Sequence, residues 1–301
     1  MANLKEVRDR IQSVNSTQQI TKAMKLVAAS KLRRAQQAIT QLRPYSEKLN
    51  SILSNIMLTI EEGADESGYS NERQINKVCL VVISSNRGLC GAYNSNVIKQ
   101  VIGLLEEGGK YHKQYEAGNV SMLFIGKKAY DILKKTYTKA TLITDYLDIV
   151  GKNFSSQDSM PIAEMLMQQY LDTDYDAIDI VYAKFRNAAM QEFEVEQFLP
   201  IAKAEAPEGQ EDFSVDFIFE PPKEDLLEYL TPTILKTQFH KTILDSNASE
   251  HGARMTAMDK ASENADELLR ELKINYNKAR QEAITTELGE IVGGAAALES
   301  Q

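Results

Sequence analysis

A glycine-bearing stretch at residues 84–96, SSNRGLCGAYNSN, has residue types that could bind a phosphate group. It follows a predicted strand and precedes a predicted helix, and such a turn aims free backbone N–H groups at an anion. The stretch lacks the GxGxxG spacing of dinucleotide sites, and no GK[ST] follows a GxxxxG spacing. Gly126, Lys127 and Lys128 end the next predicted strand and are equally incomplete. A nucleotide site is therefore an alternative that the spacing does not favour.

Metal and nucleophile chemistry is also poorly supported. The acidic run DTDYD (172–176) resembles the start of a calcium loop, but Ala177 stands where that loop needs glycine and Ala183 where it needs glutamate. Three histidines are scattered without HExxH or HxxE spacing: His112, His240 and His251. Cys79 and Cys90 belong to no CxxC pair, which favours free thiols in a reducing compartment. The sequence therefore predicts no catalytic, cofactor-binding or metal-binding residue, and His251 is interpreted as a packing residue.

The candidate loops are placed by an alternation of short apolar runs and helical stretches. Strands are predicted at 77–84, 119–126 and 176–184, and helices at 94–107, 127–136 and 159–171. This alternation is typical of a parallel sheet covered by helices. Two later runs, 192–201 and 214–219, flank an acidic loop at 205–212 and are predicted to be edge strands or a hairpin. We therefore expect a Rossmann-like α/β domain over residues 75–220.

The N-terminal segment, residues 1–62, has a different periodicity. In a repeat of alternating three- and four-residue steps from residue 4 to residue 60, thirteen of seventeen positions are apolar. The exceptions are Gln18, Thr21, Lys25 and Ser46. Such a repeat predicts one side of a coiled coil. Pro44 is the only interruption, and a bend is expected there.

The C-terminal segment, residues 223–301, repeats the pattern and predicts a second long helix. Its seam positions are Leu244, Ala248, His251, Met255, Met258, Ser262, Ala265, Leu269, Leu272, Tyr276, Ala279 and Ala283. If the two helices pair in antiparallel and start level at the α/β domain, residue 60 lies beside about residue 226. The residue numbers of each facing pair then add to about 286. Residues from Ile284 onward would then have no partner within the chain. This unpaired stretch ends in the apolar, small-residue run IVGGAAAL (291–298).

Charge is distributed unevenly along the chain. Residues 1–60 contain ten Lys or Arg and three Asp or Glu, a net charge of +7, although the whole chain has a net charge of −9. The acidic total argues against a general nucleic-acid binder. The basic helix could be a solvated face, or it could bind an acidic protein partner. The N-terminus has no apolar stretch or cleavage site, and no apolar run is long enough to cross a bilayer, so we expect neither a secretory signal nor membrane insertion.

Three segments together resemble one family over essentially the whole chain. They are ITKAMKLVAASKLRRAQ (20–36), RGLCGAYNSN (87–96) and YNKARQEAITTELGEIVGGAAAL (276–298). The sequence is similar to the gamma subunits of F-type ATP synthases, the central rotor shafts of those complexes. Members commonly have Asp where Asn86 stands and Gly where Ala92 stands.

The resemblance implies a fold and a role. It implies a long antiparallel two-helix coiled coil with an inserted α/β domain. It also implies a chain that catalyses nothing: ATP forms on the surrounding alpha/beta hexamer, and the shaft, turned by the proton-driven membrane ring, forces each catalytic site through its conformations. With no chloroplast-type cysteine insert and no transit peptide expected, we predict a peripheral protein on the cytoplasmic face of a bacterial inner membrane.

The resemblance further implies four groups of partner contacts. The beta lever loops would meet Met24, Lys25, Arg87, Cys90 and Arg254. The hexamer's inner loops would meet Arg280, Gln281, Thr285 and Glu287. The hydrophobic sleeve would hold the tip at Ile291, Val292, Ala295 and Leu298. The epsilon subunit and the membrane ring would meet Phe217, Phe219 and Glu220.

Two alternatives from other functional classes remain at this stage. A nucleotide-binding α/β protein could dimerise through its coiled coil, and it would then bind ATP at the 84–96 loop. A static coiled-coil scaffold would tolerate deletion of residues 288–301 without any change in assembly or coupling.

Overall fold

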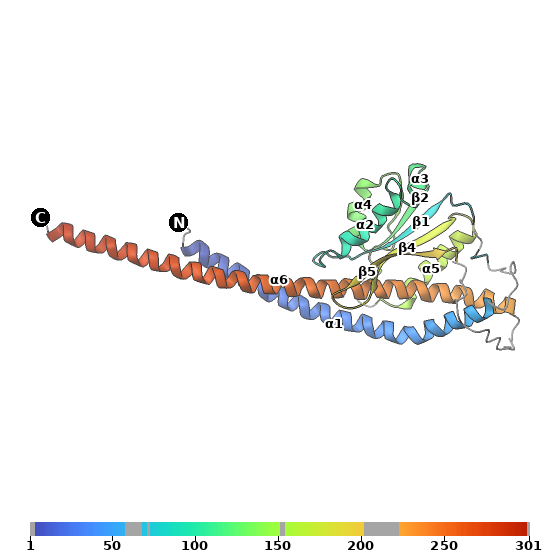
Figure 1. Ribbon diagram of the computed structural model, residues 1–301, viewed down its shortest axis with the longest axis horizontal. Helices are drawn as coiled ribbons and strands as arrows, with labels where there is room; N and C mark the ends of the chain where they lie inside the picture. The colour runs from blue at the N-terminus through green and yellow to red at the C-terminus, as the bar shows by residue number, and fades with distance from the viewer. Residues whose placement is uncertain (1–3, 58–67, 71–72, 151–153, 202–222, 300–301) are drawn as a thin grey trace. The chain divides into compact units, whose positions relative to one another are not determined.

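The computed structural model describes residues 4–57, 68–70, 73–150, 154–201 and 223–299 (Figure 1). The chain divides into two compact units, one of Met1–Ala28 with Met255–Gln301 and the other of Ala29–Arg254. The predicted domain boundaries near residues 62, 75 and 220 stay a prediction, and Phe217, Phe219 and Glu220 lie outside the described residues.

Two long helices contribute to both units. Helix α1 covers Leu4–Met57 and helix α6 covers Lys223–Glu299, which confirms the two predicted helical segments over their described parts. Pro44 lies inside α1 and Pro232 lies near the start of α6. No described helix combines the length and the apolar character that a bilayer crossing requires.

The buried side of α1 follows the predicted repeat. Its buried positions are Val7, Gln18, Thr21, Ala28, Leu32, Ala35, Ser46 and Leu49, and each is a seam position. The polar exceptions Gln18, Thr21 and Ser46 are thus as buried as their apolar neighbours. A stripe with an average period of 3.5 residues is what a coiled coil requires.

The unit of residues 29–254 contains a five-stranded sheet in the order β3-β2-β1-β4-β5. Its strands are β1 (Val78–Ile83), β2 (Val120–Ile125), β3 (Thr141–Ile143), β4 (Ala177–Phe185) and β5 (Gln191–Leu199). All neighbours pair in parallel except β4 and β5, which are antiparallel. The predicted run at 192–201 is therefore an edge strand, as expected, while the run at 214–219 lies outside the described residues.

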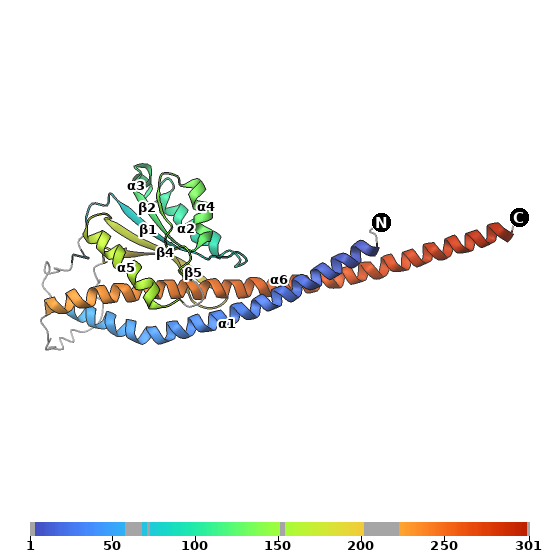
Figure 2. The same cartoon turned by 180° about the vertical axis from the view of Figure 1, so that it is seen from behind.

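Helices cover both faces of the sheet, as Figures 1 and 2 show. They are α2 (Tyr93–Leu105), α3 (His112–Glu116), α4 (Lys127–Thr136) and α5 (Ser156–Leu171). On β1, Val78, Leu80 and Val82 pack with α2 and α4, and the alternate residues pack with α5 and α6. The side chains of a strand point alternately to opposite faces, so one short apolar run supplies both cores. Strand β3 and helix α3 were missed from the sequence.

Candidate functional site

In a doubly wound fold the ligand usually binds at the carboxyl ends of two neighbouring strands, which are β1 and β4 in this sheet. Strand order reverses at this pair, since β2 and β3 lie on one side of β1 and β4 lies on the other. In open α/β sheets the crevice outside such strand ends accepts nucleotides. The candidate loop 84–96 begins at this edge, directly after β1.

Helix α6 lies against this edge. The Arg254 guanidinium donates hydrogen bonds to the carbonyl oxygens of Gly88 and Arg87, the latter at 3.2 Å. A Cβ placed on Gly252 would lie 3.2 Å from the carbonyl oxygen of Ala188, in the turn after β4. The Tyr93 hydroxyl is 2.6 Å from Ser246 Oγ. Helix α6 therefore packs against the loops at the edge where a nucleotide would be expected to bind.

The polar side chains of the loop are engaged with one another. Asn94 Oδ1 accepts hydrogen bonds from the backbone N–H of Ser85 at 3.1 Å and from its hydroxyl at 2.9 Å. Asn94 Nδ2 also lies 3.2 Å from Cys90 Sγ, and Cys90 is buried. Leu89 has a left-handed φ of 64° and is exposed, and Arg87 is exposed beside it. The loop presents Arg87 and Leu89 to solvent and keeps its thiol inside.

The other candidate motifs have structural contacts. Lys127 forms an ion pair with Asp148 at 2.8 Å. Asp172 caps the end of α5, and the Asp176 carboxylate accepts backbone hydrogen bonds ahead of β1. Among the residues that the structure describes, no group of three or more His, Cys, Asp or Glu side chains could hold a metal ion.

The histidines are separated in the fold and take part in packing. His240 Nδ1 is 2.7 Å from the hydroxyl of buried Ser159, and Phe154 stacks on the His240 ring. His112 Nδ1 is 2.9 Å from the carbonyl oxygen of Leu105. His251 is buried on the seam of α6, and its Nδ1 has no hydrogen-bond partner within the described part of the chain.

His251 should make the chain less stable in acid. Burial, together with the positive charges of Lys31 and Arg254, lowers the pKa of His251 from 6.5 to about 4. Between those values the unfolded chain binds the proton more readily, so stability falls as pH falls through this window. We expect His251 to account for a loss of about 2 kcal/mol in the free energy of unfolding between about pH 7.5 and pH 5.

Urea unfolding of the full chain at both pH values measures this effect. His251→Gln should remove that part of the pH dependence, and His112→Gln serves as the matched control. An unchanged pH dependence in His251→Gln would contradict the burial of a neutral imidazole.

In the unit of residues 1–28 and 255–301, polar side chains form consecutive layers of the seam. Gln18 donates to Asp266, the Thr21 and Ser262 hydroxyls are 2.8 Å apart, and Lys25 Nζ lies 2.5 Å from Asp259. Partner numbers add to 283 or 284, slightly below the expected 286. The prediction assumed pairing that starts level at residues 60 and 226, and the observed register is shifted by about half a helical turn.

These layers explain why polar residues occupy apolar positions. A hydroxyl or amide in a seam is tolerated when it meets a polar partner, and such layers specify register at some expense in stability. Lys25 is half-buried and its ammonium is paired inside the chain, whereas Lys22 lies 3.7 Å from Asp266 with an exposed side chain. Met24, next along the helix, is also half-buried.

Beyond the paired region, α6 continues with exposed side chains. Ala279 is partly buried, and every residue over 280–292 is exposed. This stretch contains Arg280, Gln281, Thr285 and Glu287, together with the exposed apolar side chains Ile284, Leu288, Ile291 and Val292. Ala295 is exposed, and Leu298 lies within α6 with its side chain outside the described set.

Comparisons with known proteins agree on one family. The family model described as ATP synthase matches residues 3–298. The ATP synthase gamma chain of Cytophaga hutchinsonii is 50% identical over 301 residues and 100% of both chains. The ATP synthase gamma chain of Christiangramia forsetii is 51% identical over 300 residues, 99% of each chain. The chain belongs to the ATP synthase gamma chain family.

Solved structures match the fold of this gamma chain. A chain of the Euglena gracilis mitochondrial ATP synthase, in an assembly of OSCP, F1 and c-ring, gives a TM-score of 0.66 at 21% identity, over 99% of this chain and 95% of that chain. A chain of the Tetrahymena thermophila central stalk and c-ring gives 0.55 at 23% identity, over 81% of this chain and 99% of that chain. Both likenesses concern fold, and they agree with the predicted architecture of paired helices with an α/β domain.

The gamma-chain residues named from the sequence fall into separate places. Arg87, Cys90 and Arg254 are brought together at the carboxyl end of β1. Arg254 is only 11% exposed at its side chain and bonds inside the chain, and Cys90 is buried, so Arg87 is the accessible member of the three. Met24 and Lys25 lie in the other unit, with the exposed stretch over 280–292.

Three acidic residues of this gamma chain hold these side chains in place, and the sequence analysis did not predict them. Glu250 pairs with Arg254 at 2.5 Å, and Asp259 and Asp266 pair with the polar seam residues of α1. The sequence does carry a pattern that could have located Asp259 and Asp266. These residues lie seven positions apart beside the seam, and they face Lys25 and Gln18 once the register of the two helices is known. Glu250 carried no comparable signal.

Proposed function

We propose that this chain is the rotating central shaft of an F-type ATP synthase. It couples proton-driven rotation of a membrane ring to the conformational cycle of a catalytic alpha/beta hexamer, and it catalyses nothing itself. One observation supports this role best. Helix α6 continues beyond the region where it pairs with α1, and its side chains over 280–292 are exposed. The helix ends in the small and apolar run IVGGAAAL (291–298), which suits an axle end that turns within other chains.

The proposed contacts follow the surfaces already described. The exposed stretch over 280–292 would meet the inner loops of the hexamer, and the apolar tip would sit in its hydrophobic sleeve. Met24 and Arg87 would face the acidic lever loops of beta, and Lys25 would reach them with the exposed part of its side chain, beside its ion pair with Asp259. Arg254 would act there mainly by holding the Arg87 loop, since its own guanidinium is engaged. Phe217, Phe219 and Glu220 would meet epsilon and the ring, at the cytoplasmic face of a bacterial inner membrane.

The nucleotide-binding alternative is disfavoured by the position of α6. Arg254 and Gly252 of that helix lie against the loops that follow β1 and β4. Titration of the isolated chain with ATP distinguishes the two functions. Stoichiometric ATP binding at the 84–96 loop is expected of a nucleotide-binding protein and not of a shaft.

Copurification tests the proposed role directly. When a tagged chain is coexpressed with the alpha and beta subunits of its own source, we expect one copy to elute with the hexamer. Elution of the chain alone, with the hexamer intact elsewhere, would refute the role of a shaft.

A charge added near Lys25 should disturb coupling more than assembly. Met24→Lys would place a further cation beside Lys25 on α1 and bind the acidic lever loops too tightly. A surface ion pair contributes about 1 kcal/mol, which slows each release step about five-fold. We expect fewer protons pumped per ATP hydrolysed in membrane vesicles, and normal coupling in Met24→Leu. Unchanged pumping in Met24→Lys would remove Met24 from the contact.

A further inference from the structure

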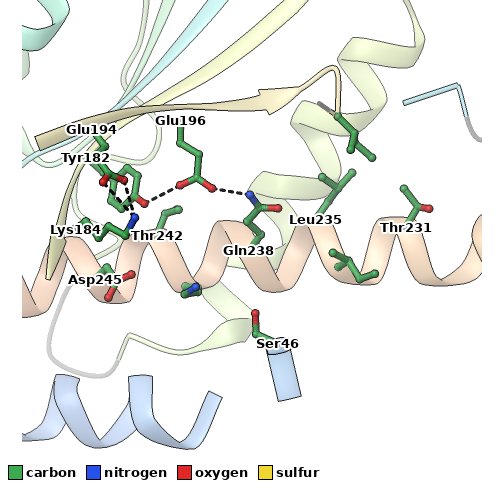
Figure 3. Close-up of a pocket in the computed structure, with 13 residues that line it drawn as sticks. Ser46, Tyr182, Lys184, Glu194, Glu196, Thr231, Leu235, Gln238, Thr242 and Asp245 are labelled. Atoms are coloured by element: carbon green, nitrogen blue, oxygen red, sulfur yellow. Dashed lines mark hydrogen bonds and ion pairs between the residues drawn. The ribbon is translucent and has the colours of Figure 1, made fainter. Parts of the chain in front are cut away.

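A cavity of about 550 Å³ lies in the unit of residues 29–254, between β4, β5, α6 and Ser46 of α1 (Figure 3). Its volume is in the range of sites that bind small molecules. Ile201, Ile234 and Leu235 provide an apolar part of its lining. No residue assigned to a partner contact lines it, so it requires an account beyond the proposed function.

The carboxylates of this cavity are unevenly satisfied. Glu194 forms an ion pair with Lys184 at 3.1 Å. Glu196 accepts hydrogen bonds from the Tyr182 hydroxyl at 2.7 Å and from Gln238 Nε2 at 2.6 Å, and both donors are neutral (Figure 3). Asp245 is 7% exposed, and no hydrogen bond from the described residues reaches its carboxylate. Two carboxylates thus face the cavity without an ion pair among these residues.

The charges around Asp245 come from every element packed against it. Burial and, to a smaller extent, the negative charge of Glu196 on β5 raise the pKa of Asp245 to about 6, against the opposing positive charges of Lys241 on α6, Lys184 on β4 and Arg43 on α1. At neutral pH the carboxylate is still ionised, although it is removed from water and close to a second negative group. A buried charge is costly unless it is paired, so the cavity favours an added positive charge.

The residues that line the cavity indicate which kind of cation it could bind. Within the described residues no cluster of three metal-binding side chains exists, and hard metal ions need six or more oxygen ligands. An organic cation needs fewer hydrogen bonds and brings an apolar body that can pack on Ile234 and Leu235. We propose that this cavity binds a small organic cation, a primary ammonium or guanidinium group on a short aliphatic chain, held between Glu196 and Asp245.

Isothermal titration of the full chain with putrescine tests the proposal, with 1,4-butanediol as the neutral probe of equal length. We expect saturable one-to-one binding of putrescine and none of butanediol. Asp245→Asn should weaken binding at least about ten-fold, because the neutral amide no longer attracts the cation. Glu228→Gln, at an exposed position of the same helix outside the cavity, is the matched control and should bind as the unaltered chain does.

The pH dependence of binding supplies a second measurement. Since only the ionised carboxylate attracts the cation, the fraction of competent chain falls as pH falls through the pKa of Asp245. Apparent affinity should drop about ten-fold between about pH 7.5 and pH 5, and Asp245→Asn should lose this dependence.

Several outcomes overturn the proposal. They are equal binding of butanediol, unaltered binding in both Asp245→Asn and Glu196→Gln, or no binding of putrescine to the folded chain. Two variants are used so that a folding defect in one leaves the other decisive. All of these measurements use the chain alone, so they do not depend on its proposed role as a shaft.

Discussion

Gly126→Ala should abolish the ordered packing of the two central parallel strands. Gly126 lies between β2 and α4, where it is the N-cap residue of α4, with φ of 100° and ψ of 142°, a conformation open essentially only to glycine. A Cβ at this position would lie 2.0 Å from the backbone carbonyl oxygen of Ser84, at the end of β1. Strain of about 1–3 kcal/mol from the backbone alone adds to this clash. We expect a total loss above about 4 kcal/mol in the free energy of unfolding.

The clash cannot be relieved by a side-chain movement. Ser84 N donates to the Ile125 carbonyl oxygen at 2.7 Å, and Ser84 Oγ accepts from Ala129 N at 3.1 Å, so the strand end and the start of α4 are tied together. Relief requires the ends of β1 and β2 to separate. That separation would also displace the loop that carries Arg87.

Hydrogen exchange measured by mass spectrometry provides the readout. Peptides covering β1 and β2 should lose protection, while peptides from α1 over residues 4–28 should keep theirs. Gly103→Ala is the matched control, because Gly103 lies inside α2 with no atom within 4 Å of an added Cβ. Alanine there should be neutral or stabilising by up to about 1 kcal/mol. Normal protection of β1 and β2 in Gly126→Ala would contradict the assigned backbone geometry.

The elements that the sequence predicted well are those with a strong period. The seam of α1 could be located because its repeat extends over many turns, and burial at Val7, Leu32 and Leu49 confirms it. Strands β1, β2 and β4 were found because both faces of a parallel sheet are buried, which leaves continuous apolar runs. Strand β3 has three partly exposed or exposed residues and no such run, so nothing in its composition distinguished it.

The register and the polar pairs depend on tertiary geometry that no local pattern encodes. The sequence identified Gln18, Thr21 and Lys25 as exceptions in an apolar seam, but their partners depend on an offset between two helices more than 200 residues apart in the chain. The same limit applies to the candidate site. Arg254 was named through family resemblance, and its engagement with the 86–91 loop follows only from how that loop packs on α6.

Arg254→Met should destabilise the unit of residues 29–254 by about 3 kcal/mol at neutral pH, because it would leave the buried carboxylate of Glu250 without its cation. The side chains of Arg254 and Glu250 are 11% and 13% exposed and lie 2.5 Å apart. Burial raises the pKa of Glu250, and the hydrogen bond and charge of Arg254 lower it. Without Arg254 the pKa of Glu250 should rise further, so protonation in acid should reduce the cost of the substitution.

A double-mutant cycle separates the buried charge from the lost loop contacts. Arg254→Met combined with Glu250→Gln should recover most of the lost stability in urea unfolding, since the carboxylate is then neutral. The double variant should still lack the bonds to the Gly88 and Arg87 carbonyl oxygens, so faster hydrogen exchange over residues 86–91 should persist. If Glu250→Gln recovers nothing, the role of Arg254 is confined to the loop. If exchange over residues 86–91 is unchanged in either variant, Arg254 does not hold that loop. The packing of α6 on the ends of β1 and β4 must then rest on Gly252 and Tyr93.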